Sequence, residues 1–119
     1  MIRVEIERDP LTSRIVAFRI RGHAQFAEEG RDIVCAGVSA VSVGTVNAVE
    51  SLLSVSMQTH MEKGDLAARL PDHLDEETAE KAQLILESMV VMLRTIEASY
   101  GEYVNVTDVR ASSREQTHP

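Results

Sequence analysis

Apolar residues change their spacing repeatedly along this chain, and that pattern constrains the fold more than any other feature of the sequence. At 2–7 and again at 15–21 they alternate with polar residues, which is typical of strands with one buried face. Asp9 and Pro10 provide a turn between these two runs. Two later segments have the length and the apolar spacing of helices, one from about Cys35 to Ser54 and, most clearly, one from Asp75 to Tyr100.

Shorter alternating runs predict three further strands, at 55–61, 66–70 and 103–109, with 63–65 as the turn between the first two. The resulting order ββαββαβ predicts an α+β fold, in which a mainly antiparallel sheet carries two helices on one face. The other face is expected to be polar or covered by a partner. Residues 1–110 are expected to form a single domain and the polar residues 111–119 a flexible tail.

Composition excludes several classes of function. The net charge is −7 and aromatic residues make up 3% of the chain, so nucleic acid binding is not expected, and a basic peptide is the more compatible partner. The apolar stretch at 34–55 is interrupted by serines, Asn47 and Glu50, so no membrane span is predicted.

A single cysteine and a charged N-terminal segment favour the cytoplasm. The histidines lie far apart and no phosphate-binding glycine loop is present, so neither a metal nor another cofactor is predicted.

The segment 22–39 places the only cysteine close to a histidine that follows a glycine. Cys35 and His23 are therefore candidates for a nucleophile and its general base. An ordinary thiol has a pKa of about 8.5, so its thiolate is scarce at neutral pH. The dipole at a helix start stabilises a thiolate by about 0.3–1 kcal/mol, which lowers the thiol pKa by less than about one unit. A nearby imidazolium would have to supply most of any further lowering of that pKa.

Other residues of this loop have two interpretations each. Gly22 and Gly30 suit the positive φ angles of a tight loop. Asp32 either caps the following helix through an amide at its start or orients His23. Cys35, which has apolar neighbours, is alternatively a small buried hydrophobic residue, and the histidine alternatively belongs to a simple turn. Spacing alone does not identify the reaction.

This segment resembles the ribosomal-processing cysteine protease family (Prp), whose members carry a Gly-His-Ala loop and an Asp-Ile-Val-Cys-Ala helix start. The resemblance implies a cysteine endopeptidase in which His23 is the general base and Cys35 the nucleophile, with Gly22, Asp32 and Ser39 as supporting residues. The matching positions are Gly22, His23, Ala24, Ala27, Gly30, Asp32, Ile33, Val34, Cys35, Ala36, Val38 and Ser39. The polar extension at 111–119 is not a feature that we associate with the family.

The same resemblance implies a substrate and an assembly. The substrate would be a large-subunit ribosomal protein made with a short N-terminal extension, which ends in aromatic residues followed by alanine or a similar small residue. The protein would form a homodimer. In the expected reaction, His23 takes the thiol proton, the thiolate attacks the carbonyl, amides at the helix start stabilise the oxyanion, and water releases the acyl enzyme. The competing hypothesis is a noncatalytic binding or assembly factor for a ribosomal protein, in which the loop is a peptide-binding edge.

Overall fold

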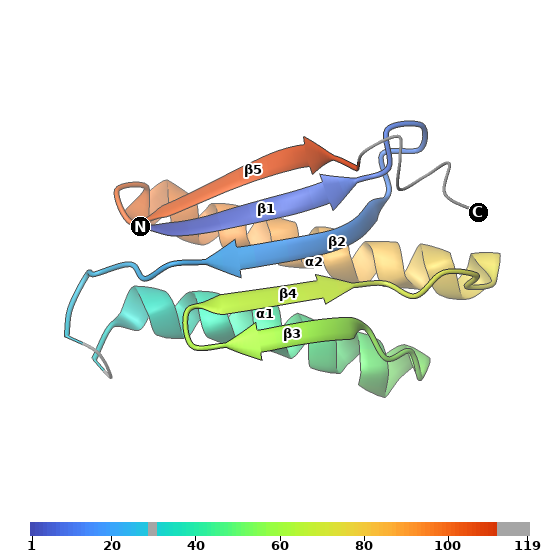
Figure 1. Cartoon of the computed structure of the whole chain (residues 1–119), viewed down its shortest axis with the longest axis horizontal. Coiled ribbons are helices and arrows are strands. Elements are labelled where there is room, and N and C mark those ends of the chain that lie inside the picture. Colours follow the sequence, from blue (N-terminus) through green and yellow to red (C-terminus); the bar gives the residue numbers. More distant parts are fainter. Residues whose placement is uncertain (29–30, 112–119) are drawn as a thin grey trace.

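The computed structural model describes residues 1–28 and 31–111, and there it contains one sheet with two helices packed on one face (Figure 1). The predicted order ββαββαβ is confirmed. The elements are β1 (Ile2–Arg8), β2 (Ile15–Arg21), α1 (Ile33–Leu53), β3 (Gln58–Glu62), β4 (Asp65–Arg69), α2 (Glu76–Tyr100) and β5 (Val104–Arg110).

The sheet is mainly antiparallel, as predicted, but it is mixed. Its strand order is β3-β4-β2-β1-β5, and β1 pairs with β5 in parallel, with Ile2 opposite Val104. The other described pairings are antiparallel. A parallel neighbour needs a long crossover connection, and the return of the chain through α2 provides it. Because β1 and β2 are central, the end of β2 is held by neighbours on both sides.

The core lies between the sheet and the helices. Val4, Ile6 and Phe18 point from β1 and β2 toward the helices, and Leu86 and Leu93 of α2 meet them; each of the five is at most 2% exposed. Asp75 accepts a hydrogen bond from the amide of Thr78 and caps α2, so the predicted start of this helix is also its N-cap. Alternating strands and an amphipathic helix therefore build the core that the spacing predicted.

α1 packs against α2, and it buries polar as well as apolar residues. The hydroxyls of Ser42 and Thr45 are buried and donate to main-chain carbonyls four residues earlier, at 2.8 and 2.7 Å. From the sequence, Val49, Leu52 and Leu53 are all available for the buried face of this helix, but Leu52 is 73% exposed. The core stripe of α1 continues from Val49 to Leu53, four residues later, and this places Leu52 about a quarter of a turn away from it.

By length and composition alone, α1 is apolar enough to cross a membrane. A core helix of a soluble protein passes the same test, and α1 buries Val34, Val38 and Val49 in this fold. The apolar character of α1 is therefore weak evidence for a membrane span.

The third strand begins later than its alternating pattern predicted. Val55 and Met57 are buried, but they belong to the connection before β3. Every residue of β3 is exposed, and β3 is an edge strand with a neighbour on one side only. Ala111, the first residue of the predicted tail, is buried, and its amide donates to the carbonyl of Arg8 at 2.8 Å, so the prediction of a flexible tail is wrong for this residue. The other residues of the predicted tail, 112–119, lie outside the described part of the chain.

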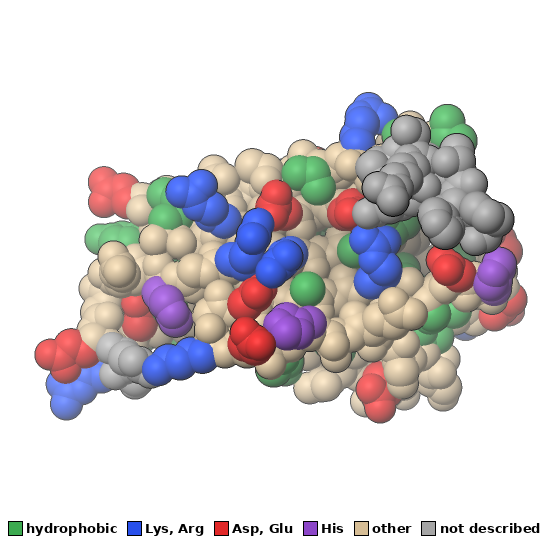
Figure 2. All heavy atoms as spheres, viewed as in Figure 1, with side chains coloured by type: hydrophobic (Ala, Val, Ile, Leu, Met, Phe, Trp, Pro, Cys, Tyr) green, Lys and Arg blue, Asp and Glu red, His purple; other side chains and the backbone are tan. Residues whose placement is uncertain are grey.

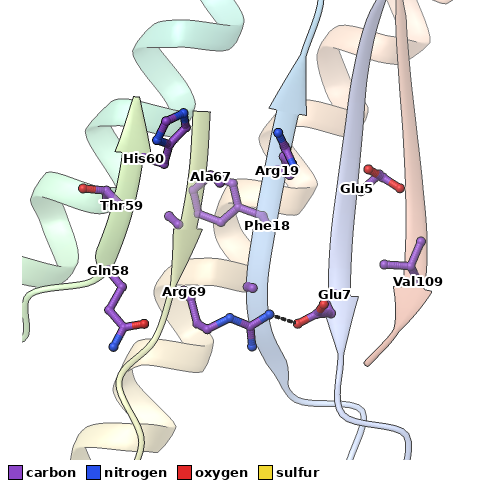
Figure 3. Close-up of a pocket in the computed structure, with 12 residues that line it drawn as sticks. Glu5, Glu7, Phe18, Arg19, Gln58, Thr59, His60, Ala67, Arg69 and Val109 are labelled. Carbon is purple, nitrogen blue, oxygen red and sulfur yellow. Dashed lines mark hydrogen bonds and ion pairs between the residues drawn. The ribbon is translucent and has the colours of Figure 1, made fainter. Parts of the chain in front are cut away.

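The sheet face opposite the helices is polar, which agrees with the expectation from the sequence. Basic and acidic side chains mix over it (Figure 2). Arg69 of β4 reaches across β2 to Glu7 of β1 at 2.5 Å (Figure 3), and Arg19 pairs with Asp65 at 2.9 Å. These pairs flank a hollow of about 470 Å³, which neither His23 nor Cys35 lines. The charges of this face are thus engaged with one another, away from the candidate site.

Candidate active site

Three segments that are distant in the sequence meet at one end of the molecule. They are the loop that leaves β2, the first turns of α1 and the turn between β3 and β4 (Figure 1). The pairing of β2 with β4 brings the first and third together, and the amide of Gly22 donates to the carbonyl of Gly64 at 2.9 Å. The sheet therefore builds the frame that the loop and the helix complete.

Asp32 fastens the start of α1 to the loop. One carboxylate oxygen accepts hydrogen bonds from the amides of Val34 and Cys35, both at 3.0 Å. The other oxygen accepts from the amides of Phe26 at 3.0 Å and Ala27 at 3.4 Å. The geometry favours the helix cap over orientation of His23, because both oxygens bind backbone amides.

Asp32 is buried among these donors, at 8% exposure. Burial acts to raise the pKa of its carboxyl, but hydrogen bonds from the four amides outweigh burial and hold the pKa below its usual value. The side chain is therefore a buried carboxylate whose charge is met by the main chain of the loop and the helix.

Cys35 is the third residue of α1 and is half-buried. The amide of Ala24 lies 3.3 Å from its Sγ and donates to it. His23 precedes that alanine and has an exposed side chain. An N–H group directed at a sulfur complements negative charge on that sulfur. The environment of Cys35 thus differs from the purely apolar packing of the alternative interpretation.

The structure brings His23, Cys35, Asp32 and Ser39 to the wall of one cavity of about 570 Å³. Ser39 lies four residues after Cys35, so the two share one face of α1. A smaller cavity of about 290 Å³ adjoins the first and shares His23, Cys35 and Ser39 with it. The full lining of the larger cavity is His23, Gln25, Ala27, Asp32, Cys35, Ala36, Ser39 and Lys63.

Gly22, predicted to need a special backbone conformation, has φ +100°. A Cβ there would lie 2.3 Å from the carbonyl oxygen of Met1, so both the conformation and the space require glycine. Gly30, the other glycine predicted for this role, lies outside the described residues.

The helix-start amides predicted to stabilise the oxyanion are largely in use. Those of Val34 and Cys35 donate to the Asp32 carboxylate, and that of Ala36 donates to the Asp32 carbonyl at 3.0 Å. These three amides therefore have protein partners in this structure, because the cap and the helix itself take up the donors. Their role toward an oxyanion stays a prediction.

Three residues at this site were not identified from the sequence. Gln25 lines the larger cavity and has a positive φ of 59°, Lys63 lines both cavities, and Gly64 lines the smaller one. Lys63 and Gly64 reach the site through strand pairing, which local sequence patterns do not report. The sequence did predict a turn at Gly64, but nothing in the sequence related that turn to His23.

An aromatic cluster anchors the loop at its outer side. The ring of Phe26 makes edge-to-face contacts with Tyr100 and Tyr103, at centroid distances of 5.5 and 5.2 Å. These tyrosines flank the connection from α2 to β5. The loop is thus held by Asp32 on the helix side and by Phe26 on the side of the C-terminal connection.

Among residues 1–28 and 31–111, no group of three or more histidine, cysteine or acidic side chains is arranged to hold a metal ion. His60 and His73 are exposed, and neither lines the two cavities described above.

An α+β fold that presents a cysteine and a histidine to one cavity at a helix start points to a cysteine protease. The sequence profile of the family described as "Cysteine protease Prp" matches residues 1–105 of this chain. The chain belongs to this family.

Curated relatives agree with the profile. The chain is 42% identical over 113 residues to the "Ribosomal processing cysteine protease Prp" of Bacillus subtilis (strain 168), covering 90% of this chain and 96% of the relative. It is 30% identical to the protein of the same name from Mycoplasma pneumoniae, over 92% of this chain and 97% of the relative.

Solved structures share the fold. A crystal structure of an essential ribosomal processing protease Prp from S. aureus, with a covalently linked product peptide, matches with a TM-score of 0.81 and 37% identity. A second structure of that protease, with a substrate peptide, gives a TM-score of 0.77 and 35% identity. Each match covers 92% of this chain and 100% of the other. This chain is therefore similar along nearly its whole length to a protease that has been seen with peptides.

Proposed function

We propose that this protein is a cysteine endopeptidase that removes a short N-terminal extension from a large-subunit ribosomal protein, with Cys35 as the nucleophile and His23 as the general base. The observation that carries the proposal is the common cavity of His23 and Cys35, in which the Ala24 amide donates to Sγ. The names of the relatives support the ribosomal substrate.

The reaction begins when the His23 imidazole takes the proton from Sγ of Cys35. The sulfur then attacks the scissile carbonyl carbon, and a C–S bond forms while the carbonyl oxygen becomes an oxyanion. The C–N bond breaks, the leaving amine receives the proton held by the imidazole, and an acyl enzyme remains. Water, deprotonated by His23, attacks the thioester and releases the carboxylate product and the thiol.

Asp32, Gly22 and Ser39 support these steps. Asp32 and Gly22 fix the two ends of the loop, to the start of α1 and to the β3–β4 turn respectively. The nearby helix-start amides are engaged, so the oxyanion needs donors from elsewhere in the cavity. The Gln25 carboxamide and the Ser39 hydroxyl line it and are the candidates for this role.

The partner of the enzyme is a basic peptide segment. The net charge of −7 attracts a basic ribosomal protein and repels polyphosphate, so direct nucleic acid binding is not part of the function. We place the protein in the cytoplasm, where ribosomal proteins are made, and we expect it to act as a homodimer without a metal or another cofactor. Resemblance to the family supports the dimer.

The proposal is tested with a peptide that spans the extension of the ribosomal precursor, analysed by chromatography after incubation. We expect the wild-type protein to cut it once, after the aromatic residues, and His23→Ala to lower the rate by several orders of magnitude. Replacing the aromatic residues of the peptide with serine should abolish cutting. A peptide that both proteins bind and neither cuts would identify a noncatalytic binding factor.

The pairing of the two residues is tested by alkylation of Cys35 with iodoacetamide across a range of pH. The wild-type thiol should react rapidly at neutral pH, where an ordinary thiol reacts slowly because its thiolate is scarce. His23→Ala should slow this reaction. An identical pH profile for both proteins would remove His23 from the mechanism.

A further inference from the structure

The turn between β3 and β4 forms a wall of the smaller cavity beside His23. Gly64 lies in this turn with φ +75°, a conformation that suits glycine, and its carbonyl accepts the amide of Gly22. His23 follows Gly22 directly in the chain. The turn is thus tied to the backbone that carries the imidazole, although the two segments are about 40 residues apart in sequence.

The imidazole of His23 lies against the bare Cα of Gly64. A Cβ built on Gly64 would be 2.7 Å from Nε2 of the ring and 3.0 Å from its Cε1. Cβ atoms essentially never approach a neighbour within 3.0 Å, so any side chain at position 64 would push this ring edge away. The crowded edge carries Nε2, one of the two ring nitrogens able to take up a proton.

We propose that Gly64 is a positioning residue, whose missing side chain sets the place of the His23 imidazole beside Cys35. This inference rests on the proposed function, in which His23 takes the thiol proton. A histidine with an exposed side chain has many rotamers available, and the contact with the turn restricts them on one side. The turn is therefore part of the catalytic apparatus, although it supplies no reacting group.

The variants for the test are Gly64→Ala and Gly64→Asn, with Gly44→Ala as the matched control. Asparagine tolerates a positive φ better than alanine, so the Asn variant reduces backbone strain but keeps the crowding of the ring. A Cβ on Gly44 of α1 would meet no atom within 4 Å. Thermal unfolding of each variant shows that it is folded.

Both Gly64 variants should lower kcat for the peptide by about 100-fold, the scale expected when a catalytic group is displaced by about 1 Å, and should leave KM within about threefold. Gly44→Ala should stay within about twofold of wild type. Wild-type kcat in either Gly64 variant would overturn the proposal.

A double-mutant cycle with His23→Ala distinguishes positioning from a general effect on the fold. Without the imidazole, the methyl group of Gly64→Ala has space, so this substitution should slow Cys35 alkylation in the wild-type background and change it less than about twofold in the His23→Ala background. The drop in unfolding midpoint should also be smaller there. Additive effects in both measurements would overturn the inference.

This cycle separates the two proposals. If the wild-type protein cuts no peptide but the cycle is still non-additive, the proposed function fails and the positioning contact stands. If the wild-type protein cuts the peptide and the cycle is additive, only the role of Gly64 fails.

Discussion

Phe26→Ala should release the loop between β2 and α1, which carries the candidate site, from the C-terminal connection. Phe26 is 41% exposed, so rather more than half of its side chain is covered, and its ring contacts Tyr100 and Tyr103. The substitution removes both edge-to-face contacts and leaves the Asp32 hydrogen bonds to the loop in place. The loop is then held by its hydrogen bonds, without the aromatic contacts.

The magnitude follows from these contacts. Full burial of a phenylalanine side chain contributes about 1.5–3 kcal/mol, so the covered part of this one contributes about 1–2 kcal/mol. Each edge-to-face pair adds about 0.5–1.5 kcal/mol, and the lower end applies at a partly exposed site. A total of about 2 kcal/mol corresponds to a change of about 30-fold in the ratio of docked to undocked loop.

The assay is hydrogen exchange of the amide at position 26, which donates to Asp32 when the loop is docked. We expect exchange about 30-fold faster in Phe26→Ala and an intermediate rate in Phe26→Leu, which keeps apolar area but loses the aromatic ring. Leu11→Ala is the control, since Leu11 is 90% exposed in the β1–β2 turn and should leave the rate unchanged. An unchanged rate in Phe26→Ala would refute the aromatic anchor.

Two further predictions concern electrostatics. The pKa of the Asp32 carboxyl is lowered in the fold, so its stabilising contribution is fully present above the unfolded value of about 3.9 and is lost as pH falls through the folded value. The difference in free energy of unfolding between wild type and Asp32→Asn, measured with urea, should therefore be largest near pH 7 and shrink below about pH 4; a constant difference would contradict this. For a basic peptide substrate, kcat/KM should fall as salt rises from about 0.05 to 0.5 M, because screening weakens its attraction to a protein of net charge −7. A rate independent of salt would exclude this attraction.

Local sequence patterns were sufficient for the order of the elements and for the expectation that His23 and Cys35 lie near each other, since both line one cavity. Alternation identified β1 and β2, and the three-and-four spacing with Asp75 at its start identified α2. The helix cap by Asp32 was one of the two interpretations of this residue. The sequence suggested it because a carboxylate three residues before Cys35 can accept hydrogen bonds from the open amides of a helix start. These features depend on residues that are close in the chain.

The features that the sequence did not predict depend on contacts between distant segments. The buried Val55 and Met57 continued the apolar alternation of β3, and only the pairing of β3 with β4, which starts at Gln58, shows where the strand begins. The contact between Gly64 and His23 arises from the pairing of β2 with β4. The Asp32 carboxylate binds two amides at the start of α1, and this sets how many amides remain free there. The spacing of residues in the sequence does not determine that number.

The central claim is that Cys35 cuts a ribosomal protein precursor. Its most direct test is mass spectrometry of the intact large-subunit precursor from the same organism, after incubation with the wild-type protein and with Cys35→Ala. We predict a single cut near the N-terminus of the precursor with the wild-type protein and an intact precursor with Cys35→Ala. Cutting at the same position by purified Cys35→Ala, or an intact precursor with both proteins, would contradict the account.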